Sequence, residues 1–249
     1  GQTNQVKVYQ LRVYLRQISP MIWRRLLVRS DSTIADLHYT LQISMGWDDF
    51  HLHQFIIRGK RYGESRMDGL LFSDNPRQLL LGDFRFRLKE RFLYEYDFMD
   101  GWILDIRLEK TLAADAKGIH PRCTAGRRAT PPEDCGGSEV YLARLDRYAI
   151  ERWDALMRLV EIAEPFLCGD DRADVDDERL RDAFDAVEAC ARFRPEHFDR
   201  RAVNVALRGL AGTVDWPTQP GLKGTLKAEA SHLSIQLLRV SSVRLSAIP

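Results

Sequence analysis

The chain has 249 residues, of which 45% are hydrophobic and 29% are charged. This composition supports a sizeable buried core and argues against disorder of the whole chain. The formal net charge at pH 7 is only +1, so no global field would hold the protein on nucleic acid or on an anionic membrane.

Hydrophobic runs and cysteine spacing indicate the cellular compartment in which the protein is expected. No apolar run approaches the roughly 20 residues needed to cross a bilayer, and residues 1–7 lack the apolar segment of a signal peptide. The four cysteines show neither C-x-x-C spacing nor the density of a disulfide scaffold. We therefore expect a cytoplasmic protein with mostly reduced thiols and no membrane partner.

The start of the chain has a strand–strand–helix–strand pattern. Residues 6–15 and 22–28 alternate apolar and polar side chains, as the two strands of a hairpin do. On the second strand Arg24 interrupts an apolar face, and a charge facing the core is costly unless a carboxylate partner pairs with it. Asp97, Asp100, Glu133 or Asp134 could supply this partner. A capping box then predicts a helix that starts after Thr33 and ends near Gly46.

Strand patterns continue after this helix, and helical patterns follow them. Residues 52–57, 84–88, 92–98 and 102–108 read as strands, the last two joined by a turn at residues 99–101, whereas residues 113–137 read as irregular. Helical spacing recurs in residues 146–163, 177–191 and 195–210, where one apolar stripe contains Trp153, Leu156, Leu159 and Val160. The acidic run 170–178 lacks the central glycine of a calcium loop and favours a solvated linker. Residues 233–245 are modestly apolar but have no clear helix caps.

These patterns predict an α+β fold. We expect a mixed sheet with a β-grasp-like strand–strand–helix–strand start, followed by a C-terminal helical lobe. The expected domains are a sheet domain over residues 6–145, a helical lobe packed on it over residues 146–210, and an uncertain tail over residues 211–249.

Four stretches of sequence together resemble one protein family. They are Pro20–Arg25, the run from Leu37 to Phe55, Tyr94–Trp102 and the Pro-Pro-Glu-Asp-Cys-Gly-Gly run at residues 131–137. In order and spacing they are similar to the Ri-plasmid ORF-three-like family, also labelled insertion-element passenger or TnpR-like proteins. The resemblance covers roughly residues 6–210.

The resemblance implies a protein carried by plasmids or other mobile genetic elements, with unestablished biochemistry. It suggests recombination only by association, because the sequence has no recognisable recombinase core or helix-turn-helix. Family members usually have a glycine where this chain has Met99 and a histidine where it has Leu104. On a strand, Leu104 shares a face with Trp102, so it could simply enlarge the core.

Chemistry-bearing side chains gather in the matching stretches. Histidines two apart on a strand point to one face, so His51 and His53 could bind a divalent metal with a carboxylate or thiolate from another segment. The candidate site consists of Arg24, His51, His53, Asp97, Asp100, Trp102, Glu133, Asp134 and Cys135. The alternative, which we favour, is that His51 and His53 cap or bridge backbone groups and that Asp97 and Asp100 organise the tight turn before Trp102. The sequence therefore predicts no cofactor, with a divalent metal as the minority hypothesis.

Two further readings of residues 131–137 stay open. Successive amides of Cys135, Gly136 and Gly137 could form an anion-binding nest, or the glycines could only permit a tight loop. Cys135 could be a nucleophile, or it could pair with Cys123 as a metal or redox site. Two buried thiols are the favoured interpretation.

Partners are not named by the sequence. A set of basic residues could form a local nucleic-acid surface, although an ordinary solvated sheet face is the favoured interpretation. The set consists of Arg12, Arg16, Arg25, Arg29, Arg85, Arg87, Lys89 and Arg91. A protein partner is equally open. The leading hypothesis is a non-catalytic binding or adaptor protein, and the alternative is a metal-assisted hydrolase using His51 and His53 with nearby acids.

Overall fold

A curved antiparallel sheet forms the body of the protein in a computed structural model that describes residues 5–63, 75–114, 118–168 and 177–211. The strands of these residues are β1 (Lys7–Leu15), β2 (Trp23–Arg29), β3 (His53–Ile57), β4 (Lys60–Tyr62), β5 (Arg91–Tyr96), β6 (Trp102–Ala113) and β7 (Arg122–Arg127). The helices are α1 (Ile34–Met45), α2 (Gly137–Leu167), α3 (Asp177–Arg192) and α4 (Arg200–Ala211). The strand order is β4-β3-β5-β6-β1-β2-β7.

The expected α+β class with C-terminal helices is confirmed. The strand–strand–helix–strand order at the start is present as β1, β2, α1 and β3. The sequence predicts a mixed sheet, whereas every strand pair in the described residues is antiparallel. Hairpin connections bring β1 beside β2, β3 beside β4 and β5 beside β6, which explains the antiparallel pairing of those strands.

Helix α1 begins where the capping box predicts. The Asp36 amide donates to Thr33 Oγ1 at 3.0 Å, and the Thr33 amide donates to Asp36 Oδ2 at 2.7 Å. Gly46 ends the helix with a φ of 80°, a left-handed conformation that glycine adopts without a Cβ clash. Leu37 and Leu41 are fully buried, so this helix packs its apolar stripe into the core.

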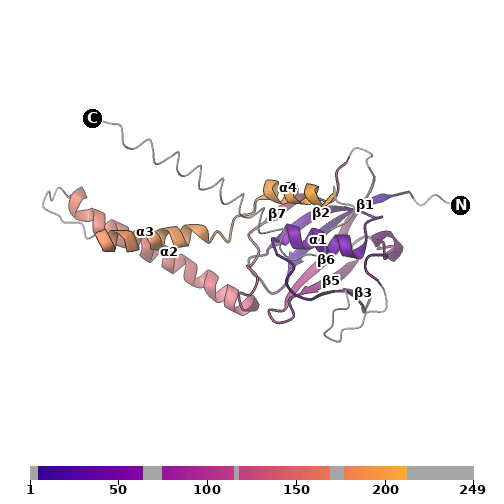
Figure 1. Ribbon diagram of the computed structural model, residues 1–249, viewed down its shortest axis with the longest axis horizontal. Helices are drawn as coiled ribbons and strands as arrows, with labels where there is room; N and C mark the ends of the chain where they lie inside the picture. The colour runs from indigo at the N-terminus through magenta and orange to yellow at the C-terminus, as the bar shows by residue number, and fades with distance from the viewer. Residues whose placement is uncertain (1–4, 64–74, 115–117, 169–176, 212–249) are drawn as a thin grey trace.

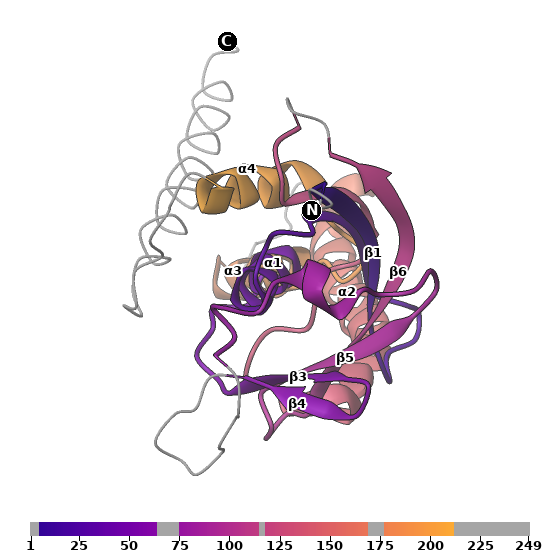
Figure 2. The same ribbon diagram turned by 90° about the vertical axis from the view of Figure 1, so that its right-hand side faces the viewer.

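The sheet bends around α1 (Figure 2). Alternation along β1 and β2 sends side chains such as Leu11, Val13 and Leu26 into the concave side and their neighbours outward. Helix α4 lies beside α1 and contacts β7. One core cluster therefore fills the space between the sheet and these two helices.

Helices α2 and α3 pack on each other and extend away from the sheet (Figure 1). Below, "the arm" means α3 together with residues 146–167 of α2. The apolar stripe that the sequence predicts on α2 is divided between two environments. Leu159 is half-buried, whereas Trp153 is 65% exposed.

Residues 84–88, which the sequence predicts as a strand, do not pair in the sheet. A short 3-10 helix, Leu81–Phe84, ends at this point, and Arg85 adopts a left-handed φ of 47°. Phe84 stacks on Phe86, and Phe86 stacks on Phe92 of β5. The alternating phenylalanines therefore reflect aromatic stacking rather than strand pairing.

Residues 113–137, expected to be irregular, contain β7, which pairs with β2. Cys123 is the only buried apolar side chain of β7, so the sequence lacks the alternating pattern that would predict this strand. A Cβ at Gly126 would overlap the ring of Phe198, which precedes α4. This glycine therefore allows the chain before α4 to approach β7 closely.

The helical segments differ from expectation mainly at their starts. Helix α2 begins at Gly137 rather than at 146, and α4 begins at Arg200 rather than at 195, whereas α3 begins at Asp177 as expected. Most of the acidic run 170–178 and the apolar run 233–245 lie outside the described residues. No helix in the described ranges is long and apolar enough to cross a membrane. The division into three domains stays a prediction.

Candidate functional site

The loop of residues 131–137 is tied to the rest of the molecule through Glu133. The Asp48 amide donates to Glu133 Oε2 at 2.9 Å, and the Tyr96 hydroxyl donates to Glu133 Oε1. Burial raises the pKa of Tyr96, so its hydroxyl keeps its proton and stays a donor. The same hydroxyl accepts from the Phe50 amide at 3.1 Å. Glu133 therefore joins this loop to the segment after α1 and to β5.

Arg24 is buried beside the C-terminus of α1. The residue is only 2% exposed. Its Nε donates to the Ser44 carbonyl at 2.9 Å, its Nη1 donates to the carbonyls of Trp23 at 2.8 Å and Arg127 at 3.0 Å, and its Nη2 donates to Thr130 Oγ1 at 3.0 Å. The guanidinium is thus held by four oxygen atoms from four different residues.

The ion pairs predicted for Arg24 with Asp97, Asp100, Glu133 or Asp134 are not among these contacts, so this prediction is wrong. The Ser44 carbonyl lies in the last turn of α1, where carbonyls carry partial negative charge and lack helical partners. These carbonyls replace the expected carboxylate. Burial lowers the pKa of Arg24 to about 10, so the side chain is still charged at neutral pH.

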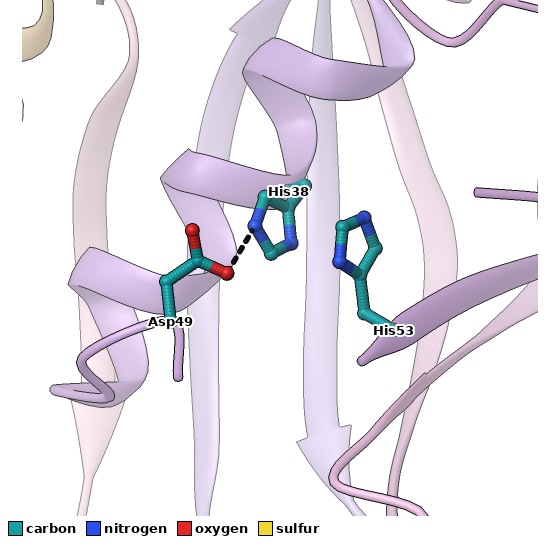
Figure 3. A group of neighbouring side chains, drawn as sticks. All are labelled: His38, Asp49 and His53. Atoms are coloured by element: carbon teal, nitrogen blue, oxygen red, sulfur yellow. Dashed lines mark hydrogen bonds and ion pairs between the residues drawn. The ribbon is translucent and has the colours of Figure 1, made fainter. Parts of the chain in front are cut away.

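A closed ring of hydrogen bonds joins α1 to β5. Gln42 Nε2 donates to the Tyr94 hydroxyl at 2.8 Å, so the hydroxyl proton is free to point at His38 Nδ1, also at 2.8 Å. His38 Nε2 then donates to Asp49 Oδ1 at 2.9 Å (Figure 3). The Asp49 amide closes the ring by donating to Gln42 Oε1 at 3.1 Å. Each group in the ring has a partner.

His53 completes this cluster by stacking rather than by ligation. Its ring lies parallel to that of His38 with centroids 3.6 Å apart (Figure 3). Sequence reasoning missed the ring, although one signal was available. His38 lies four residues after Ile34 and three before Leu41, on the apolar stripe of α1. A polar residue on such a stripe requires a buried partner.

His51 and His53 belong to different clusters. Strand β3 begins at His53, so His51 lies in the bend before the strand and does not share its alternation. His51 Nε2 is 3.6 Å from Asp97 Oδ2 and 3.1 Å from Asp134 Oδ1. A metal site built from both histidines, as the sequence suggests, is therefore not assembled, whereas one histidine meets two of the predicted acids.

The predicted anion nest is partly filled from within. The Gly136 amide donates to Asp100 Oδ2 at 3.2 Å, so a side chain of this protein takes the place of an external anion. Gly137 has a φ of 81°, and a Cβ there would lie 2.8 Å from the Asp100 carbonyl oxygen. The glycines thus serve a tight contact between residues 131–137 and the β5–β6 turn.

The cysteines give no support to nucleophilic or redox chemistry. Burial raises the pKa of the Cys135 thiol, which disfavours the reactive thiolate. Cys123 is a free and buried thiol, and its Sγ donates to the Ala125 carbonyl at 3.3 Å. All four cysteines lie in described segments and all are free.

The two departures from the family pattern occupy different environments. Leu104 is fully buried opposite Tyr94 in the β5–β6 register, on the same inner face as Trp102. Trp102 stacks near Trp47 with ring centroids 6.5 Å apart. Met99 is exposed in the turn before β6. Leu104 therefore extends the core beside the buried ring of hydrogen bonds.

Acidic side chains pair with the basic residues on the outer face of the sheet. Arg25 Nε is 2.6 Å from Glu109 Oε2, and Arg12 and Arg107 lie 3.9 and 3.7 Å from the other oxygen of the same carboxylate. Arg91 pairs with Asp105 at 3.4 Å. These pairs favour an ordinary solvated sheet face over a nucleic-acid surface.

Glu109→Gln is expected to lower the free energy of unfolding by about 1 kcal/mol at pH 7 and by less at pH 3. Burial opposes ionisation of Glu109, but hydrogen bonds from Arg25 and Gln10 hold its pKa below the ordinary value. A carboxylate with a depressed folded-state pKa stabilises the fold above its unfolded pKa of about 4.3, and this contribution is lost as pH falls through the folded value. Urea unfolding at both pH values measures the effect. A penalty that grows on acidification would contradict it.

The curved antiparallel sheet, its capped helix and the histidine–tyrosine ring buried between them define the protein as an α+β protein with a polar cluster built into its core. The chain belongs to the plasmid pRiA4b ORF-3-like family, whose model matches residues 7–202. The family resemblance seen in the sequence is thereby confirmed.

Two relatives extend this comparison. The uncharacterized protein y4hQ of Sinorhizobium fredii is 35% identical over 138 residues, which is 54% of this chain and 69% of that protein. The crystal structure of a protein of unknown function, MM3350, from Methanosarcina mazei Go1 is 31% identical, with a TM-score of 0.57. That match covers 80% of this chain and 97% of the other. The MM3350 protein therefore shares the fold of this chain.

Proposed function

We propose that the protein is a non-catalytic adaptor that binds a helix of a protein partner on its arm. The observation that carries the proposal is an open row of apolar side chains along α2. The exposed members of this row are Ile150, Trp153, Leu156, Met157 and Val160. Below, "the open row" means these five residues.

The spacing of the open row is that of a helix-packing surface. Residues 150, 153, 157 and 160 are separated by three, four and three positions, the spacing of apolar residues along a coiled-coil seam. A neighbouring row on α2 is already covered: Ala155 is buried, and Tyr148 and Leu159 are half-buried. Since α2 packs on α3, one apolar row of this helix is filled and the other is open among the residues that the structure describes.

A groove continues this apolar surface toward α3. It lies between the two helices, and its lining includes Leu156 of the open row together with Val187 and Cys190 of α3. Isolated exposed apolar residues are normal on a surface, but a contiguous patch on a projecting element is typical of an interaction site.

The charges along one flank and at the ends of the open row favour basic side chains on the partner, whereas Arg152 and Arg194 line the groove on the other flank. With 3.6 residues per turn, exposed Asp154 and Glu161 lie along one side of the row, and exposed Asp146 and Glu164 lie at its two ends. A second copy would bring acidic rims together, which costs binding energy, whereas a helix with an apolar face and basic flanks would be attracted. The predicted occupant is therefore an amphipathic, basic helix of another protein.

A metal-assisted hydrolase using His51 and His53 with nearby acids is less well supported. The two histidines lie in different clusters, and the His38 cluster is a closed ring with no group left for a substrate. Of three surface cavities in the described residues, one is lined by the arm, one by outer-face residues of the sheet and one by Arg58 with residues 85 and 87–90, and none of these three includes His38, His51 or Asp97. Carriage by mobile elements, the TnpR-like association and the cytoplasmic location stay predictions.

Trp153→Glu is expected to weaken partner binding by at least about tenfold, because it places a charge at the centre of an apolar contact. Leu88→Glu is the matched control, since Leu88 is 62% exposed but lies outside the arm. Proteins that the wild type and the control retain from host extracts, but that Trp153→Glu loses, are then purified. Titration calorimetry with each purified candidate measures the change in affinity.

Sedimentation of the purified chain separates this proposal from self-association. We expect a monomer up to about 100 μM, because the acidic rims oppose pairing of two arms. A dimer that Trp153→Glu dissociates would show that the occupant is a second copy and would overturn the proposal. Equal affinities of Trp153→Glu and Leu88→Glu for every purified candidate would also overturn it.

A further inference from the structure

We propose that His51, Asp97 and Asp134 bind a divalent first-row transition-metal ion. The proposal goes beyond the adaptor function, because the three side chains lie in the body of the protein rather than on the arm. They come from three segments: the bend before β3, the end of β5 and the loop of residues 131–137. One ligand atom of each lies within 4.8 Å of the other two.

The distances within this group suit a shared ion. Metal–nitrogen and metal–oxygen bonds of about 2.0–2.2 Å place neighbouring ligand atoms about 2.9–3.5 Å apart in tetrahedral or octahedral geometry. His51 Nε2 is 3.1 Å from Asp134 Oδ1 and 3.6 Å from Asp97 Oδ2. The third distance, between the ligand oxygens of Asp97 and Asp134, is no more than 4.8 Å, so the three side chains need to move together only slightly to share one ion.

The independent sign of a ligand is an unsatisfied buried carboxylate oxygen. Asp97 is only 1% exposed, and its Oδ2 has no hydrogen-bond partner although it faces His51. His51 Nε2 is also buried without a hydrogen-bond partner of acceptable geometry. Buried polar atoms left unpaired cost free energy, and two of them facing each other require an explanation. A bound cation satisfies both.

The other oxygen of Asp97 is already held in place. Asp97 Oδ1 accepts the amides of Met99 at 3.2 Å and Asp100 at 3.3 Å, and the Asp97 amide donates to the Leu52 carbonyl at 3.0 Å. These bonds orient the carboxylate and leave Oδ2 as its free ligand atom, the kind of outer support that metal-binding carboxylates have. Asp134 can adjust its position to the ion, because its side chain is 74% exposed.

The second group with ligand spacing, His38, Asp49 and His53, does not carry the same inference. His38 and Asp49 already form the closed ring with Gln42 and Tyr94, and His53 stacks on His38. Binding an ion there would break existing hydrogen bonds. Of these two groups, only the His51 group therefore has buried polar atoms without a hydrogen-bond partner.

The donor set selects the class of ion. One imidazole and two carboxylates suit Zn²⁺ or Mn²⁺, whereas Mg²⁺ and Ca²⁺ prefer oxygen ligands alone. Asp134 is exposed to solvent, so water would complete the coordination sphere. A site with three protein ligands leaves such open positions.

Asp97→Asn tests the site in the full-length chain after metal has been removed with a chelator. Asparagine keeps Oδ1 as an acceptor for the two amides, so the fold should be retained, as the far-ultraviolet circular dichroism spectrum checks. Competition between the protein and a zinc-sensitive dye gives the affinity. We expect one Zn²⁺ per wild-type chain and an affinity at least about 100-fold weaker for Asp97→Asn, because even outer-shell changes cost about 10- to 100-fold.

Asp105→Asn is the matched control, because Asp105 is also buried with an unpaired oxygen but lies beside Arg91 on the outer face. Its affinity for Zn²⁺ should equal that of the wild type. Asp134→Asn changes an exposed ligand, so it should weaken the affinity for Zn²⁺ without disturbing the fold. Millimolar Mg²⁺ should not displace Zn²⁺ from the wild type. Absence of stoichiometric Zn²⁺ or Mn²⁺ binding, or equal affinities in Asp97→Asn and Asp105→Asn, would overturn the proposal without affecting the adaptor function.

Discussion

Arg24→Met is expected to lower the free energy of unfolding by about 3–5 kcal/mol. The change leaves the carbonyls of Ser44, Trp23 and Arg127 without the donors that hold them, and each unpaired buried group costs about 1–3 kcal/mol. It also removes the cation that lies 3.8 Å above the Phe198 ring. Urea unfolding at pH 7, followed by tryptophan fluorescence, measures the loss.

Arg29→Met supplies the control on the same strand. Arg29 pairs with Asp31 at the surface, and such pairs contribute about 0–1 kcal/mol. A loss of stability in Arg24→Met no larger than that in Arg29→Met would show that the buried guanidinium does not hold β2, β7 and the end of α1 together.

Removing the imidazole of His38 is the second change that we expect to lower the free energy of unfolding strongly. His38→Leu fills a similar space but leaves the Tyr94 hydroxyl and the Asp49 carboxylate without their partner, at a cost of about 2–4 kcal/mol. Burial raises the pKa of Tyr94 well above its ordinary value, so the tyrosine cannot compensate by losing its proton. Equilibrium unfolding of the variant measures the cost.

A double-mutant cycle with Tyr94→Phe isolates the ring itself. Groups in one hydrogen-bonded network are not additive, so His38→Leu and Tyr94→Phe together should cost about 1–2 kcal/mol less than the sum of the single changes. Tyr14→Phe, on the outer face of β1, should add to His38→Leu within about 0.5 kcal/mol. Additive costs for His38 and Tyr94 would contradict a coupled ring.

Local sequence signals predicted the elements whose cause is local. The Thr33–Asp36 pair and Gly46 predicted both ends of α1, because caps act through hydrogen bonds and backbone dihedrals within a few residues. The turn at residues 99–101 predicted the β5–β6 hairpin for the same reason. Strand β7 escaped prediction because its pairing with β2 depends on tertiary contacts rather than on an apolar pattern.

The sequence named three residues that lie together in the structure, but it did not show how they pair. His51, Asp97 and Asp134 were all named from the sequence, and the structure brings these three together. His53 was assigned to the same face as His51 because a strand was assumed to include both, whereas β3 begins only at His53. A shift of strand start by two residues is enough to separate two side chains.

For Arg24 the sequence predicts the need for a partner but not which atoms provide it. The sequence indicates that a buried cation needs a partner, but the partners that it makes visible are carboxylate side chains. The Ser44 and Arg127 carbonyls that hold the guanidinium are main-chain atoms, and no residue type signals them. Only the position of α1 relative to β2 and β7 reveals that a helix C-terminus faces this strand.

The central claim is that the open row of α2 receives a helix of another protein. A photoreactive amino acid at position 157, where Met157 is exposed within the row, tests it most directly in cells that express the chain. We expect a crosslink to one other protein that is lost when Trp153 is also changed to glutamate and is not formed by the same probe at position 88. Crosslinks only between copies of this chain, or the same products from both positions, would contradict it.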